Sequence, residues 1–240
     1  MLPTVILPGY LAPAQDYIGL QQQLLKLDID TVIVPLQRRD WLVTLGGRPV
    51  TPILQRLDHT IQQILEHTQA PQVNIIGHSA GGWISRIYMG AKPYCGQVWQ
   101  AGSVVNTLIS LGTPHTSQET WTQRNLNFVN DHYPGAFHPH VKYICVAGKA
   151  LYGQRSWRLG QWFTYSSYKV TCGEGACWGD GVTPIISAHL PGAVNLTLND
   201  IWHSPHPTQA VSKNSRYLWY GSTEAIEIWA AYLVSPEKLR

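Results

Sequence analysis

One stretch, residues 73–83, limits the fold of this chain more than any other. A short run rich in β-branched apolar side chains ends at Ser79, which stands between Gly77 and Gly81, and helix-compatible sequence continues from 80 to 90. A sharp strand-to-helix turn holds its central residue at strained backbone angles and needs small residues two positions away on either side. We therefore expect Ser79 on such a turn, with its hydroxyl raised above the edge of a sheet.

The same turn makes Ser79 a candidate nucleophile. The first backbone N–H groups of the following helix point toward any negative charge that develops on a bound carbonyl, and Ala80 carries the nearest of them. A second donor is expected from the loop after the first strand, where Gly9 permits a close backbone approach. We assign that donor to Tyr10, with Leu11 as the alternative.

Apolar runs and amphipathic segments alternate along the chain. Parallel strands joined by crossover helices produce this order, so we predict a doubly wound, mostly parallel sheet with helices on both faces, in a single domain over 1–240. The expected strands are 4–7, 31–34, 73–77, 104–111, 141–147 and 194–198, and the expected helices are 16–27, 52–67, 80–90 and 222–233.

Two segments interrupt that alternation, at about 116–140 and 151–178. Both are irregular in pattern, rich in aromatic residues, and follow the carboxyl ends of predicted strands. Insertions at these positions are typical of a lid or cap over a binding site. We therefore expect a small cap or lid built from the two insertions.

A serine hydroxyl needs a base that removes its proton and an acid that orients the base. In the fold arrangement that this strand–turn–helix serine motif is typical of, the acid follows the serine and the histidine follows the acid, each in a loop after a strand. Asp180, between two glycines, fits the acid position best, while Asp200 is the rival and is read more simply as a turn residue.

Three late histidines are candidates for the base. His203 follows the last predicted strand by a short loop and is preferred, whereas His206 lies between two prolines and His189 precedes that strand. His78, beside Ser79, is expected to pack against it rather than act as the base. The predicted catalytic set is Ser79, Asp180 and His203.

Composition excludes several classes of protein. A net charge of +3 without basic runs argues against nucleic-acid binding, and the N-terminus lacks the charged and long apolar regions of a signal peptide, which predicts a cytoplasmic protein. The four cysteines are too few for a disulfide scaffold; Cys172 and Cys177 lie close enough in sequence to pair, and reduced thiols are the expected state.

Three motifs together resemble the lipase and esterase branch of the α/β-hydrolase superfamily. Residues 77–82 (GHSAGG), 111–115 (LGTPH) and 179–184 (GDGVTP) are similar to the elbow, the stretch after it and the acid loop of bacterial lipases, lecithin:cholesterol acyltransferase-like proteins and PGAP1-like proteins. The chain departs from many lipases at Pro8-Gly9, where they carry His-Gly.

The resemblance implies hydrolysis of carboxylic esters through an acyl-enzyme, without a metal or cofactor. The aromatic residues of the two insertions fit a lipid or another apolar acyl ester as substrate and a transient contact with a membrane surface, and they fit the packing of a cap onto the sheet equally well. Two alternatives remain open: an acyltransferase or thioesterase with the same three residues, and a non-catalytic ligand-binding protein on a hydrolase fold.

Overall fold

A six-stranded parallel sheet forms the centre of the computed structural model, which describes residues 1–157, 159–206 and 217–234. The strand order is β2-β1-β3-β4-β5-β8, and each strand runs parallel to its neighbours. The predicted doubly wound parallel sheet is thereby confirmed. The strands are β1 (Thr4–Leu7), β2 (Thr31–Ile33), β3 (Val73–His78), β4 (Val105–Leu111), β5 (Lys142–Lys149) and β8 (Val194–Asn199).

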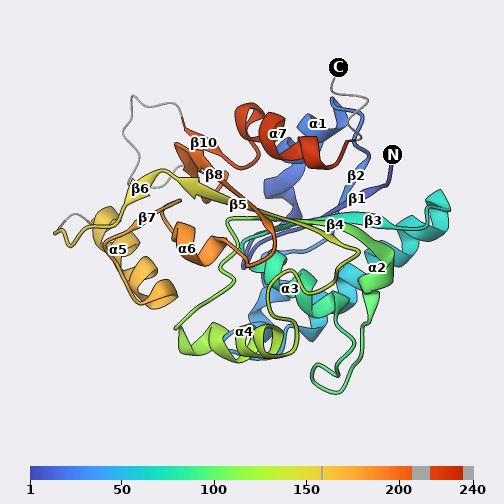
Figure 1. Ribbon diagram of the computed structural model, residues 1–240, viewed down its shortest axis with the longest axis horizontal. Coiled ribbons are helices and arrows are strands. Elements are labelled where there is room, and N and C mark those ends of the chain that lie inside the picture. Colours follow the sequence, from blue (N-terminus) through green and yellow to red (C-terminus); the bar gives the residue numbers. More distant parts are fainter. Residues whose placement is uncertain (158, 207–216, 235–240) are drawn as a thin grey trace.

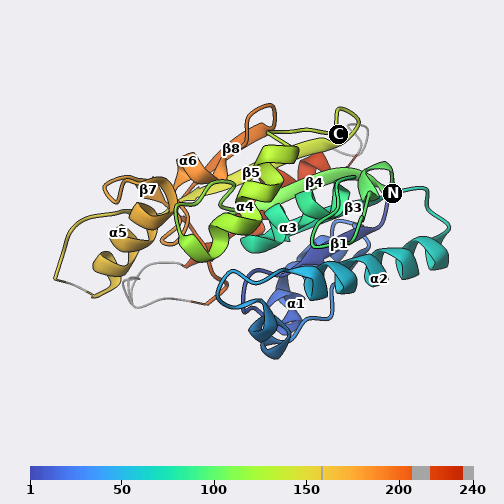
Figure 2. The same ribbon diagram turned by 90° about the horizontal axis from the view of Figure 1, so that it is seen from below.

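Helices cover both faces of this sheet (Figures 1 and 2). One face carries α1 (Ile18–Leu25) and α7 (Thr223–Trp229), and the other carries α2 (Thr51–Thr68), α3 (Ala80–Met89) and α4 (Thr120–His132). The described residues also contain four short 3-10 segments: η1 (Ala14–Tyr17), η2 (Arg38–Thr44), η3 (Ala101–Val104) and η4 (Ala230–Tyr232).

Two hydrophobic cores result, one on each face of the sheet. Successive strand side chains point to opposite faces, so in β1 Val5 and Leu7 enter the core beneath α2 and α3, while Ile6 enters the core beneath α1 and α7. Strands buried on both faces must be apolar almost throughout. This is why the fully buried β1 (TVIL) has no alternation, whereas the largely exposed edge strand β8 (VNLTLN) alternates apolar and polar residues.

Residues 116–140 are more regular than the sequence predicts. They contain α4, whose Leu126 and Val129 are buried in the core with α2 and α3, and α4 connects β4 to the parallel neighbour β5. The helix was missed because Thr, Asn and His are weak helix formers and leave only a thin apolar stripe. The predicted lid built from this segment is not confirmed.

The second segment, 151–178, is also partly helical. It consists of β6 (Leu151–Tyr152), α5 (Leu159–Cys172) and the start of β7 (Trp178–Gly179), with β6 and β7 paired antiparallel. In both views α5 lies at the end of the molecule toward which β5 runs (Figures 1 and 2). This is the end where parallel α/β sheets bind ligands.

The remaining short elements of the described residues are α6 (Ile185–Ala188), which precedes β8, and the mutually paired β9 (Ile201–Trp202) and β10 (Leu218–Trp219), which follow it. Within the described ranges, no helix combines the length and the apolar composition that crossing a bilayer requires.

Candidate active site

Ser79 occupies a strained turn between β3 and α3. Its φ of 51° and ψ of −122° lie outside the regions that side chains ordinarily favour. A Cβ on Gly77 would lie 2.5 Å from the Gly82 nitrogen, and a Cβ on Gly81 would collide with the carbonyl oxygen of Leu7. Glycine at both positions is therefore required for the turn to close, as the sequence predicted.

The position of Ser79 in the sheet is equally specific. β1 and β3 are neighbours, and the chain leaves β1 toward one side of the sheet order and β3 toward the other, so Ser79 stands at the topological switch point. Ser79 is half-buried, whereas the residues on either side of it are buried. Its hydroxyl is thus the accessible group of this turn.

His203 connects Ser79 to Asp180. Its Nε2 lies 3.0 Å from Ser79 Oγ and its Nδ1 lies 2.8 Å from Asp180 Oδ2, while its backbone N–H donates to the Asp180 carbonyl oxygen at 3.0 Å. The carboxylate can only accept, so Nδ1 carries the proton and the Nε2 lone pair faces the serine hydroxyl. The structure therefore brings together the three side chains that the sequence selected from distant segments.

Asp180 is buried and held by four donors. Its Oδ1 accepts the N–H groups of Val182 at 3.0 Å and Thr183 at 2.7 Å, and its Oδ2 accepts Tyr220 OH at 2.7 Å besides His203. Burial by itself disfavours the charged form, but His203 and the hydrogen bonds outweigh it and lower the pKa of Asp180 below its ordinary value. The carboxyl is therefore ionised at neutral pH.

Tyr220, which donates to Asp180, is the main residue of the candidate site that the sequence did not reveal. It precedes α7 in a loop without any motif, yet its hydroxyl also accepts the Gly148 N–H at 2.8 Å. Gly112, from the LGTPH stretch, has a φ of 56°, and a Cβ there would lie 2.7 Å from Asp180 Oδ2. The stretch after the elbow thus leaves room for the acid and Tyr220.

The two proposed oxyanion donors are near Ser79 but remain predictions. A Cβ on Gly9 would lie 2.9 Å from Ser79 Cβ, so the loop that carries Tyr10 runs directly beside the serine. Ala80 is the first residue of α3, where a backbone N–H has no acceptor within its helix. The Tyr10 ring packs edge-on against Trp41 at 5.2 Å and is 40% exposed.

The rival residues lie elsewhere. Asp200 is exposed in a turn with a φ of 60°, and its N–H donates to Lys149 O. His189 Nε2 pairs with Thr197 Oγ1 at 3.2 Å, and His206 Nε2 lies 3.3 Å from Asp16 Oδ1. None of these contacts leads to Ser79.

A second serine–histidine pair lies inside the molecule. Ser110 Oγ is 3.2 Å from His115 Nε2, and the Arg86 guanidinium approaches His115 Nδ1 at 3.4 Å. Burial, followed by the charge of Arg86, holds the pKa of His115 well below its usual value. Both members of the pair are buried, and in the described part of the chain no carboxylate bonds to this histidine, so we do not assign it the reaction.

Helix α5 contacts the acid loop through its inner face. Thr164 Oγ1 donates to Gly181 O at 3.2 Å, Ser167 Oγ donates to Val182 O at 2.7 Å, and Tyr168 OH accepts the Gly181 N–H at 2.8 Å. The opposite face is uncovered: there Trp162 is 59% exposed and Phe163 56% exposed, with Val170 and Lys169 beside them. The helix therefore joins an apolar outer surface to the segment that holds Asp180.

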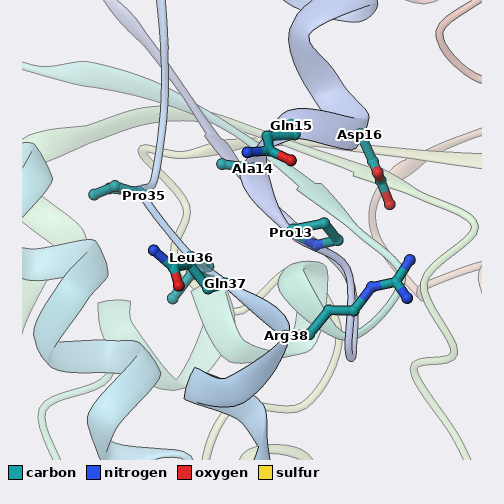
Figure 3. Close-up of a pocket in the computed structure, with 8 residues that line it drawn as sticks. All are labelled: Pro13, Ala14, Gln15, Asp16, Pro35, Leu36, Gln37 and Arg38. Atoms are coloured by element: carbon teal, nitrogen blue, oxygen red, sulfur yellow. The ribbon is translucent and has the colours of Figure 1, made fainter.

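A polar groove of about 540 Å³ lies between two segments of the chain (Figure 3). Residues 13–16 form one wall and residues 35–38 the other, and the side chains of Asp16 and Arg38 lie toward the same end. None of Ser79, Asp180 and His203 lines this groove.

No group of three or more ligand-type side chains that could hold a metal occurs in residues 1–157, 159–206 and 217–234. Asp131, His132, His138 and His140 lie close together in the sequence but accordingly form no such cluster. Cys172 and Cys177 are free thiols with their sulfur atoms 3.9 Å apart, so they are near neighbours without being bonded.

Comparison with known proteins supports the fold. Residues 42–137, less than half of the chain, match the PGAP1-like alpha/beta domain family, and this range includes the elbow and the LGTPH stretch. No curated protein sequence matches the chain.

Solved structures match over nearly the full length at low identity. Phospholipase PlaB from Legionella pneumophila has a TM-score of 0.61 at 15% identity and covers 99% of this chain, which spans 61% of that one. A protein from Lactobacillus plantarum WCFS1 described as a cell surface hydrolase has a TM-score of 0.54 at 12% identity, with coverage of 100% and 95%. The lin2722 product of Listeria innocua has a TM-score of 0.50 at 13% identity, with coverage of 85% and 87%. The chain thus has the α/β-hydrolase fold, and its residues 42–137 are similar to the PGAP1-like alpha/beta domain family.

Proposed function

We propose that this protein is a serine hydrolase that cleaves carboxylic esters through an acyl-enzyme. One observation carries the proposal: an unbroken series of hydrogen bonds from Ser79 through His203 to the ionised Asp180, at the switch point of the sheet. This is the geometry by which a hydroxyl becomes a nucleophile at neutral pH.

In the proposed reaction, Ser79 Oγ attacks the ester carbonyl while His203 Nε2 takes the hydroxyl proton. The negative charge on the carbonyl oxygen is stabilised by the N–H groups of Ala80 and Tyr10, and Asp180 stabilises the imidazolium. Collapse of the tetrahedral intermediate expels the alcohol, which receives the proton from His203. Water then attacks the acyl-enzyme with His203 again as base, and the acid leaves.

We further propose an apolar acyl ester, such as a lipid, as the substrate. Trp162, Phe163 and Val170 on the outer face of α5 offer apolar area beside the acid loop, and Arg155 and Lys169 add positive charge around it. Aromatic side chains mixed with Arg and Lys are typical of segments that contact a lipid surface transiently. The similarity in fold to a phospholipase is consistent with this class.

Esters of graded chain length test the proposal. Wild type should hydrolyse p-nitrophenyl esters and favour medium or long acyl chains, and Ser79→Ala should reduce kcat/KM by roughly 10⁴-fold or more. A fluorophosphonate probe should label wild type at Ser79 and leave the folded Ser79→Ala variant unlabelled.

The alternatives have distinct outcomes in the same experiments. Transfer of the acyl group to an added alcohol in preference to water would identify an acyltransferase. Faster cleavage of thioesters than of oxygen esters would identify a thioesterase. A folded wild type that neither turns over esters nor takes the probe would be a ligand-binding protein on a hydrolase fold, and the proposal would fail.

A further inference from the structure

A buried tyrosine and a buried histidine connect three separate segments of the candidate site. The backbone N–H of Gly9 donates to Tyr17 OH at 2.9 Å, Tyr17 OH lies 2.7 Å from His78 Nδ1, and His78 Nε2 lies 2.8 Å from the backbone oxygen of His203. Tyr17 and His78 are both buried. The series therefore runs from residues 8–11, the loop proposed to supply the Tyr10 oxyanion donor and called the oxyanion loop below, through the residue before Ser79, to the backbone of His203.

The direction of each hydrogen bond follows from the chemistry of its atoms. A carbonyl oxygen only accepts, so His78 Nε2 carries a proton and donates to His203 O. In a neutral imidazole Nδ1 is then the acceptor, and Tyr17 must donate to it while accepting from Gly9. Burial, with His203 nearby, lowers the pKa of His78 to about 3, which agrees with this neutral ring.

His203 is consequently held at both backbone groups. Its N–H donates to the carbonyl oxygen of Asp180 at 3.0 Å, and its C=O accepts from His78. The two bonds fix the peptide planes on either side of the Cα, and hence the direction in which the imidazole leaves the chain. A shift of about 1 Å in such a group can cost roughly 100-fold in rate.

The other end of the series acts on the oxyanion loop. The Gly9 N–H that Tyr17 accepts belongs to the peptide immediately before the Gly9–Tyr10 peptide. Gly9 also lies so close that an added Cβ would come within 2.9 Å of both His78 Nδ1 and Ser79 Cβ. Fixing Gly9 therefore helps to orient the next N–H, that of Tyr10, toward the space above Ser79.

We propose that Tyr17 and His78 are positioning residues that hold the oxyanion loop, the nucleophile turn and His203 in one register. The inference rests on the proposed function, because it assigns to these two residues the alignment of that same site. Neither residue touches the reacting atoms; both act through backbone groups of Gly9 and His203.

Three variants separate positioning from simple packing. Tyr17→Phe deletes one oxygen atom. His78→Gln keeps a side-chain N–H that can reach His203 O, while His78→Leu fills the space without a donor. Tyr88→Phe is the matched control, since Tyr88 is a buried tyrosine of α3 whose hydroxyl donates to Asp58 at 2.8 Å, on the α2 side.

With p-nitrophenyl butyrate, Tyr17→Phe should lower kcat by roughly 10-fold and His78→Leu by roughly 100-fold, with KM within about twofold of wild type. His78→Gln should recover most of the loss, and Tyr88→Phe should leave kcat unchanged. Equal kcat in His78→Gln and His78→Leu, or an unchanged kcat in Tyr17→Phe, would overturn the inference. If His78→Leu does not fold, the comparison of Tyr17→Phe with Tyr88→Phe decides.

Imidazole ¹⁵N NMR separates this inference from the proposed function. Wild type should show His78 as the Nε2–H tautomer, and Tyr17→Phe should shift the ring resonances of both His78 and His203. If Tyr17→Phe causes these shifts but the wild type is inert to esters and to the fluorophosphonate probe, the proposed hydrolase activity is refuted and the structural link is retained. Unshifted His203 resonances would refute the link itself.

Discussion

Replacement of Asp180 by Asn tests the proposed site most directly, because the structure determines how the new amide must lie. Asp180 Oδ1 accepts two backbone N–H groups, from Val182 and Thr183. An NH₂ group there would face two donors, so the amide oxygen must take that position. The amide nitrogen must then replace Oδ2, opposite His203 Nδ1 at 2.8 Å.

This orientation reverses the tautomer of His203. The amide N–H donates to Nδ1, so the ring proton moves to Nε2 and points at Ser79 Oγ, 3.0 Å away. A base that already carries a proton cannot remove the one on serine. In a chymotrypsin-like enzyme the same change costs about 10⁴-fold in kcat, which corresponds to about 5.4 kcal/mol of transition-state stabilisation. We expect a loss of the same order here.

The assay is kcat/KM for p-nitrophenyl butyrate, with thermal unfolding to verify that the variant is folded. Asp200→Asn is the control, because Asp200 is exposed and was the rival acid in the sequence; its rate should equal that of wild type. A folded Asp180→Asn variant within about 10-fold of wild type would refute the assignment. An equal loss in Asp200→Asn would show that the assay reports charge and not the tautomer of His203.

Three further outcomes are expected. Gly81→Ala should destabilise the protein by about 1–3 kcal/mol, since its Cβ meets the Leu7 carbonyl, whereas Gly19→Ala in α1, with no atom within 4 Å of its Cβ, should stabilise it by about 0.5–1 kcal/mol; urea unfolding measures both. The pKa of His78 is lower in the folded chain than in the unfolded one. As the pH falls from about 8 to about 5, the free energy of unfolding should therefore decrease by about 2 kcal/mol because of His78. Urea titrations of His78→Gln should show a smaller dependence on pH. The double variant Trp162→Ser, Phe163→Ser should bind phosphatidylglycerol vesicles roughly 10-fold more weakly in co-sedimentation while hydrolysing a soluble ester at the wild-type rate; undiminished binding would contradict the proposed lipid contact.

Local physics explains why the elbow could be read from the sequence. The constraint at Ser79 lies within residues 73–81: an apolar strand, a strained turn and glycines that leave space for it. These features involve only neighbours in the chain, and the structure has the strand, the turn and α3 where they were predicted. Helix α4 shows the opposite case, because its helical state depends on the burial of Leu126 and Val129 against other elements.

The order of the candidate residues along the chain was a second, weaker basis for predicting the site. Asp180 between glycines and His203 after the last strand were selected by position, and the structure places both within hydrogen-bond distance of the expected partners. Their catalytic roles, and the donors Tyr10 and Ala80, stay proposals until the variants are measured. The contacts that distinguish Asp180 from Asp200, and His203 from His206, are visible only in the folded geometry.

Amino-acid sequence alone determined the class of fold, the switch from strand to helix at Ser79 and the identity of its expected partners, since each depends on local conformation or on chain order. Tertiary structure alone decided that Tyr220 holds Asp180 and that Tyr17 and His78 join three segments. Those contacts are made between residues that are up to 125 positions apart, as His78 and His203 are, and no periodicity or motif records them. They arise because a parallel sheet brings the carboxyl ends of its strands to one edge, where distant loops must satisfy one another's buried polar groups.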